Sequence, residues 1–179
     1  MMIEEIKRIA GEISAEIIHD RRHLHANPEL SFQEINTSAF IKSRLDQAGI
    51  EYITLCNTGV VGIIEGDLGS DKVIALRADI DALPISEENQ VSYASTKNNI
   101  MHACGHDGHA AALLGAAKYL AETRRFDGVL NLIFQPAEEL LSGAAAMIRD
   151  GLFERFPCDS IFGYHNSPRA QAGTCSVRP

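Results

Sequence analysis

The sequence predicts an α/β fold with three layers, in which a mixed, largely parallel sheet is flanked by helices. Short apolar runs typical of strands alternate with segments whose apolar residues recur at helical spacing. Three of the apolar runs lead directly into ionisable side chains. If these strands are parallel, they end at one edge of the sheet. Open α/β sheets bind ligands at that edge, so polar side chains are expected at the strand ends.

Two helices and three strands are expected in the first half of the chain. Isoleucines at helical spacing predict an amphipathic helix over residues 3–20. Ser31–Glu34 has the pattern of a capping box, so a second helix is expected from there to about Ala48, ended by Gly49. Strands are expected at 52–55, 60–64 and 73–76, the last of them buried on both faces.

The second half repeats the alternation after a long connection. Residues 82–105 are rich in Asn and carry Pro84 and Gly105, which indicates a loop, and loops of that length in compact domains are usually functional. The elements expected after it are a buried helix at 110–121, a strand at 129–134, a helix at 142–149 closed by Gly151, and strands at 160–164 and 174–177.

Composition excludes several classes of protein. The 179 residues are 45% hydrophobic and 22% charged, as in soluble globular proteins. The net charge of −8 and the lack of a basic block argue against binding to nucleic acid. No apolar run approaches the ~20 residues of a membrane helix, and the N-terminus does not resemble a signal peptide. A cytoplasmic protein is therefore expected, with its four cysteines as free thiols.

Residues 101–109 read Met-His-Ala-Cys-Gly-His-Asp-Gly-His and concentrate potential metal ligands. Cys and His suit Zn²⁺ and related transition metals. If this backbone is extended, His102, Cys104 and His106 face one side. Taken singly, His102 or His109 is more often an ordinary loop or helix histidine. The neighbouring Asp107, like Asp79 at a strand end, is a candidate to hydrogen-bond a ligating imidazole.

Other histidines and acidic residues allow plainer interpretations. His19, His23 and His25 lie near the end of the first helix and are expected to face solvent or a helix C-terminus. Glu138 and Glu139 follow Pro136, where acidic residues are also common in the first turn of a helix. Adjacent carboxylates repel each other unless a cation lies nearby. One of the pair can then bind metal while the other holds a water as general base.

Five motifs in order resemble the M20 metallopeptidase family, in its amidohydrolase branch. That branch contains hippurate hydrolase, N-acyl-amino-acid amidohydrolases and auxin-conjugate hydrolases. The motifs are Leu-His-Ala-Asn-Pro-Glu-Leu-Ser-Phe-Gln-Glu (24–34), Arg-Ala-Asp-Ile-Asp-Ala-Leu-Pro (77–84), the segment 101–109, Phe-Gln-Pro-Ala-Glu-Glu (134–139) and Gly-Tyr-His (163–165).

The resemblance implies a zinc-peptidase-like catalytic domain that hydrolyses the amide bond of N-acyl amino acids such as hippurate. Its site holds two divalent metal ions, Mn or Zn, with Co or Ni as further possibilities. By resemblance the metal ligands are Cys104, His106, Glu139 and His165. Glu138 is the general base, and Asp79 is a supporting member of the catalytic set.

Members of the family are longer than this chain. They insert a lid and dimerisation domain after the strand that here ends at Val177, then return to supply a last histidine ligand. Residues 1–179 therefore correspond to the N-terminal portion of the catalytic domain, without the part through which full-length members form homodimers. An open sheet edge and exposed apolar surface are expected.

Two alternatives to this amidohydrolase remain open from the sequence. One is an inactive fragment that binds at most metal or a partner. The other is a cysteine hydrolase with Cys104 as nucleophile, in which Glu138 and Glu139 have no role.

Overall fold

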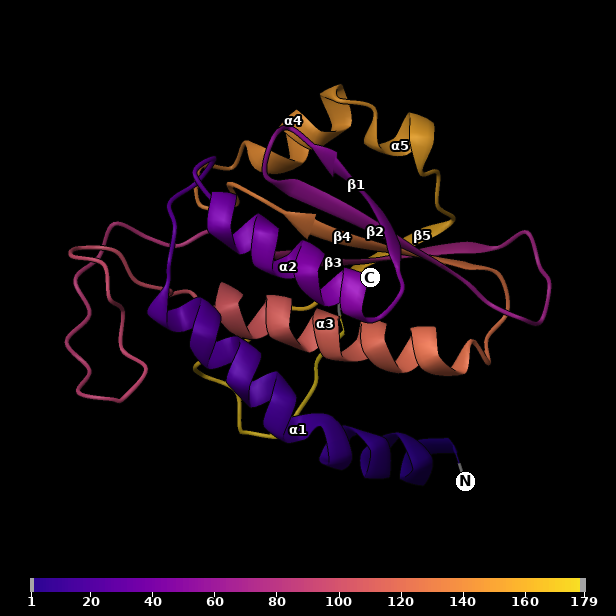
Figure 1. The fold of residues 1–179 in the computed structure, drawn as a ribbon, viewed down its shortest axis with the longest axis horizontal. Helices are drawn as coiled ribbons and strands as arrows, with labels where there is room; N and C mark the ends of the chain where they lie inside the picture. Colours follow the sequence, from indigo (N-terminus) through magenta and orange to yellow (C-terminus); the bar gives the residue numbers. More distant parts are fainter. Residues whose placement is uncertain (1, 178–179) are drawn as a thin grey trace.

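A computed structural model describes residues 2–177, and it contains five helices and five strands (Figure 1). In chain order these are α1 (Met2–Ala26), α2 (Ile35–Gln47), β1 (Glu51–Leu55), β2 (Gly59–Glu65), β3 (Val73–Asp79), α3 (His106–Thr123), β4 (Val129–Gln135), α4 (Gly143–Arg149), α5 (Leu152–Arg155) and β5 (Ser160–Gly163).

The strands form one mixed sheet in the order β1-β2-β4-β3-β5. β1 and β2 pair antiparallel, as do β2 and β4, whereas β3 runs parallel to both β4 and β5. Asp79 pairs with Gln135 in the β3–β4 register. The carboxyl ends of β3, β4 and β5 therefore meet at one edge, which confirms the expected α/β class and the grouping of three strand ends.

Helices cover the sheet on both faces, so the fold has three layers. Figure 1 shows α1, α2 and α3 on one side and α4 and α5 on the other. Ile41 and Leu45 of α2 are fully buried in the first core, with Leu132 and Phe134 of β4. Met147 of α4 packs in a separate, smaller core on the opposite face. Each large aliphatic side chain buried in this way contributes about 1.5–3 kcal/mol to folding.

Several elements differ from the sequence-based expectation. α1 continues past residue 20 to Ala26, and α3 begins at His106 instead of Ala110. Residues 174–177 form no strand. Strand β3 is not buried on both faces, because Ile74 is 44% exposed.

The prediction of a capping box at Ser31–Glu34 is wrong. α2 begins at Ile35, and the residue at its N-cap, Glu34, makes no side-chain capping bond. Ser31 Oγ instead donates to Asp81 Oδ2 at 2.6 Å. The Glu34 side chain is turned into the protein, where it bonds Thr58 and Ala137. Tertiary partners from distant segments therefore outcompete the local cap.

His25 is also placed differently from the expectation. Its ring is buried, with Nδ1 2.7 Å from Asp107 Oδ2 and Nε2 3.0 Å from Glu87 Oε1. The hydrogen bond to Asp107 raises the pKa of His25, although burial alone would lower it. The histidine thereby joins α1 to the start of α3 and to the long loop over 82–105.

Strand β5 forms an open edge of the sheet. Its four residues are exposed, and within residues 2–177 it pairs only with β3. Phe162 is 54% exposed, and Ile161 and Tyr164 are similarly open to solvent. This matches the expected apolar edge, which carries none of the charged or proline residues that usually protect such strands.

The four cysteines are free, as expected. Across residues 2–177, no helix combines the length and the hydropathy needed to cross a membrane.

Candidate metal centre

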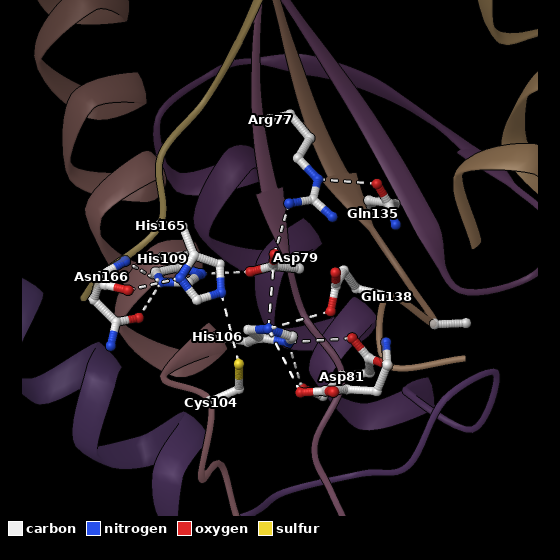
Figure 2. Close-up of polar contacts among 12 residues, drawn as sticks. Arg77, Asp79, Asp81, Cys104, His106, His109, Gln135, Glu138, His165 and Asn166 are labelled. Atoms are coloured by element: carbon white, nitrogen blue, oxygen red, sulfur yellow. Dashed lines mark hydrogen bonds and ion pairs between the residues drawn. The ribbon is translucent and has the colours of Figure 1, made fainter. Parts of the chain in front are cut away.

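The candidate site lies at the shared carboxyl edge of β3, β4 and β5, against the first turn of α3. Figure 2 shows the His106 ring at its centre, surrounded by side chains from these elements and from the segments that follow the strands. Cys104 precedes the helix, Asp79 ends β3, Glu138 follows β4 and His165 follows β5. The fold therefore brings together motifs that are far apart in the sequence.

His106 is fully buried and held in one orientation. Its Nδ1 lies 2.9 Å from the backbone oxygen of Asp81 and 3.2 Å from Asp81 Oδ1, so Nδ1 carries the proton and donates it. Nε2 then faces three carboxylates, Asp79, Glu138 and Glu139, at 3.7–3.8 Å. Nε2 has no hydrogen-bond partner among the described residues.

The electrostatics of this ring favour a cation. Burial lowers the pKa of His106, but the hydrogen bond to Asp81 and the charges of Asp79 and Glu139 raise it overall. Burial also disfavours ionised Asp79, yet the bond from His109 and the charges of His106 and Arg77 lower its pKa. The carboxylates around Nε2 thus lie in a partly buried space, where unpaired negative charges are costly.

Cys104, His106 and Glu139 form one group whose potential ligand atoms all lie within 4.8 Å of one another. Glu139 Oε1, like His106 Nε2, is buried and has no hydrogen-bond partner among the residues described. Burial and the charge of Glu139 raise the pKa of the Cys104 thiol to about 11. A thiolate therefore forms here only when a cation offsets that charge, which disfavours Cys104 as a free nucleophile.

A second group shares His106 and adds His109, Asp79 and His165, again with ligand atoms within 4.8 Å of one another. His109 lies three residues after His106, so both rings project from the same face of α3. Its Nδ1 donates to Asp79 Oδ1. The four sequence-predicted ligands therefore do not form one group: His165 joins through His106, and its Nε2 lies 3.6 Å from Cys104 Sγ.

Gly105 allows the segment after β5 to approach α3. Its φ of 91° lies in the left-handed region, and a Cβ there would come within 2.6 Å of Asn166 Oδ1. The backbone N–H of Asn166 lies 3.1 Å from His109 Nε2, and His165 Nδ1 bonds the backbone oxygen of Asn166 at 2.7 Å. The placement of His165 thus depends on Gly105, His109 and Asn166.

Sequence interpretation missed His109, Asn166 and Asp81 as parts of this arrangement. The i, i+3 spacing of His106 and His109 was a usable signal once the helix is known to begin at His106. His102 fits the plainer interpretation as a histidine outside the site, whereas Asp107 does not take the role suggested for it. Burial lowers the pKa of His102 to about 4, so it is neutral, and it lies outside both groups. Asp107 pairs with His25 and Arg21 rather than with a site imidazole.

The donor set suits a divalent transition metal. It combines a thiol, imidazole nitrogens and carboxylates. Two of its buried atoms, His106 Nε2 and Glu139 Oε1, have no hydrogen-bond partner among the described residues. Such mixed sets bind Zn²⁺, Mn²⁺ and related ions. The hydrogen bond from His106 to Asp81 is the kind of outer contact that fixes a ligating imidazole.

Comparison with known proteins agrees with this chemistry. The model of peptidase family M20/M25/M40 matches residues 75–179, more than half of the chain. Hippurate hydrolase of Campylobacter jejuni is 51% identical over 168 residues, which are 93% of this chain and 42% of that protein. An uncharacterised hydrolase of Staphylococcus aureus is 45% identical over 88% of this chain and 42% of its own length.

Two solved structures share the fold. The YXEP protein of Bacillus subtilis, a dinuclear metal binding peptidase of the M20 family, superposes with a TM-score of 0.84 at 41% identity, over 89% of this chain and 44% of its own. A protein of methicillin-resistant Staphylococcus aureus gives a TM-score of 0.85 at 38% identity, over 92% of this chain and 44% of its own. This chain therefore spans less than half the length of the relatives that it matches.

Proposed function

Since this chain belongs to peptidase family M20/M25/M40, we propose that it carries the metal-binding and proton-transferring part of an amidohydrolase that cleaves N-acyl amino acids of the hippurate type. One observation carries the proposal. His106 Nε2 and Glu139 Oε1 are buried 3.8 Å apart, and neither has a hydrogen-bond partner among the residues described. A divalent cation satisfies both atoms at once.

The proposed ligands are Cys104, His106, Glu139 and His165, and the proposed occupancy is two ions. The dinuclear centre of the Bacillus subtilis relative supports that number. Mn²⁺ or Zn²⁺ is expected, and Co²⁺ or Ni²⁺ also suits these donors. When bound, such ions lower the pKa of a water molecule and polarise the acyl carbonyl.

Glu138 is the proposed general base. Its side chain is 31% exposed, so it is open to substrate, while Oε2 lies 3.8 Å from His106 Nε2. The carboxylate takes a proton from the attacking water and passes it to the leaving amine. Asp79 is proposed to support the site, since it holds His109 and is itself held by Arg77 at 2.6 Å.

Hydrolysis of N-benzoylglycine by the metal-loaded chain, followed by release of free glycine, tests the proposal. Turnover is expected with Mn²⁺ or Zn²⁺, and a chelator should abolish it. Glu138→Gln should keep the metal but lower the rate by about 10²–10⁴-fold, the usual contribution of a general base. Activity that resists chelation and is lost on thiol alkylation would instead identify a cysteine hydrolase.

A second candidate is a fragment that binds metal or a partner without turnover. The exposed apolar residues of the β5 edge favour it. The same assay separates the two candidates. A folded, metal-loaded chain that releases no glycine, but gains activity when a longer relative's remaining portion is added, supports the fragment.

A further inference from the structure

Glu34 is a buried carboxylate far in sequence from the candidate site. Its side chain is 0% exposed, and no Lys, Arg or His pairs with it within residues 2–177. Burial raises its pKa, while hydrogen bonds from Ala137, Thr58 and nearby backbone N–H groups act in the opposite direction. An acidic group is costly to bury, so its position calls for a role that a smaller apolar residue cannot fill.

The Glu34 carboxylate joins three separate segments. Oε2 accepts a hydrogen bond from Thr58 Oγ1 at 2.8 Å, in the turn between β1 and β2. Oε1 accepts from the backbone N–H of Ala137 at 2.9 Å, across 103 positions of sequence. Ala137 directly precedes Glu138 and Glu139. The carboxylate therefore bonds the backbone that presents the two acidic residues of the site.

The segment 136–143 is a tight loop that needs such support. Ala137 has a φ of 49° and Leu141 a φ of 51°, both in the left-handed region that non-glycine residues rarely adopt. Gly143 N–H donates to Ala137 O at 3.1 Å, and a Cβ on Gly143 would come within 1.6 Å of Pro136 O. The loop folds back on itself around Ala137.

A second carboxylate holds the same loop from the other side of Glu138. Asp81 Oδ2 accepts the backbone N–H of Glu139 at 3.1 Å, while Asp81 Oδ1 lies 3.2 Å from His106 Nδ1. Glu34 and Asp81 thus fix the N–H groups of residues 137 and 139. The backbone of Glu138, between them, has little freedom to rotate.

We propose that Glu34 is a positioning residue, whose carboxylate holds Ala137 in its left-handed conformation and so directs Glu138 and Glu139 toward the metal centre. This inference rests on the proposed function for its consequences in metal binding. Its first consequence, the conformation of the loop, is independent of any metal.

Three variants separate positioning from general stability. Glu34→Asp keeps the charge but is one methylene shorter, so it cannot reach both Thr58 and Ala137. In Glu34→Gln the amide oxygen can still accept from Ala137 while the NH₂ donates to the Thr58 hydroxyl. Thr58→Val is the matched control, because it removes a buried bond to Glu34 and leaves the bond to Ala137 intact.

Hydrogen–deuterium exchange of the metal-free chain is the first readout. In Glu34→Asp the amides of residues 137–142 should exchange at least about tenfold faster, while those of β4 stay protected, because only the loop loses its anchor. Thr58→Val should lower the thermal midpoint without this local change. Glu34→Gln should resemble the parent chain.

Zn²⁺ affinity, measured by competition with a chromophoric chelator, is the second readout. Glu34→Asp should weaken it by about 10–100-fold, the usual effect of losing an outer support of a metal ligand, and Glu34→Gln should restore it. Loop exchange unchanged in Glu34→Asp would overturn the inference. So would equal loss of affinity in Thr58→Val. A parent chain that binds no Zn²⁺ would contradict the proposed function, while the exchange result would still test the role of Glu34.

Discussion

The two halves of the candidate centre are built differently. His106, His109 and Asp79 are almost completely buried, and they are fixed by hydrogen bonds to Asp81, Asp79 and Arg77 respectively. Cys104 is only partly buried, and His165 is exposed on the segment that follows the edge strand β5. The buried half rests on the packed core, whereas the other half rests on a few contacts to Gly105 and Asn166.

This difference indicates which part of the site is already arranged before a metal ion binds. Buried ligands with satisfied outer contacts need little rearrangement to bind an ion. An exposed histidine on an uncovered strand edge is free to move when its few contacts break. The buried half should therefore determine whether metal binds at all, and the exposed half should adjust the affinity.

The largest effect is expected from His106→Asn. The Asn amide can still donate to Asp81 in place of Nδ1, but no atom replaces Nε2 of His106, the residue that both groups share. Zn²⁺ affinity should fall by more than about 100-fold, because even outer contacts of a ligand are worth about 10–100-fold.

Equilibrium dialysis with elemental analysis measures this loss. His102→Asn is the control, since His102 is also buried but belongs to neither group. It should reduce stability and leave the affinity unchanged. Equal loss in both variants would show that the buried half acts only through folding.

Gly105→Ala should destabilise the link between the two halves. Alanine at this position would have to adopt the φ of 91°, and its Cβ would lie 2.6 Å from Asn166 Oδ1. A cost of about 1–3 kcal/mol in the free energy of unfolding is expected, measured by urea denaturation. Gly108→Ala, in the first turn of α3 with nothing within 4 Å of its Cβ, should stabilise the chain by up to about 1 kcal/mol. Equal changes in the free energy of unfolding in the two variants would show that Gly105 does not link the two halves.

His25 is expected to make the stability of the chain depend on pH. Its folded-state pKa is raised by Asp107, so its contribution to stability is complete below the unfolded value of about 6.5 and is lost as pH rises through the folded pKa. His25→Asn should cost about 1–3 kcal/mol at the acidic end. The difference from the parent should shrink as pH rises through the raised folded-state pKa of His25. A cost that is constant with pH would mean that His25 acts by packing alone.

The smallest effect is expected from Asn166→Ala. Its side-chain amide contacts His109 Nε2, but its backbone N–H, which also bonds this nitrogen, remains. Zn²⁺ affinity should fall by no more than about tenfold, with little change in the thermal midpoint. A loss of affinity as large as that of His106→Asn, measured by the same dialysis, would contradict the claim that the buried half contributes more to metal binding than the exposed half.

The sequence was sufficient for much of this architecture because apolar periodicity and strand ends are local signals. It predicted the α/β class and the convergence of three strand ends, whereas the ligand set of Cys104, His106, Glu139 and His165 came from the resemblance and stays a prediction. It failed where long-range partners decide. Glu34 resembles a helix cap until Thr58 and Ala137 are brought to it, and His25 looks exposed until Asp107 packs against it.

Counting the metal bound by the folded chain tests the central claim most directly. A monodisperse gel-filtration fraction should contain about two equivalents of divalent metal per chain, as in two-metal hydrolases. Cys104→Ala should lose this metal while eluting at the same volume. A folded, monodisperse chain without metal after incubation with Mn²⁺ or Zn²⁺ would contradict the claim, because the unpartnered atoms of His106 and Glu139 would then hold no ion.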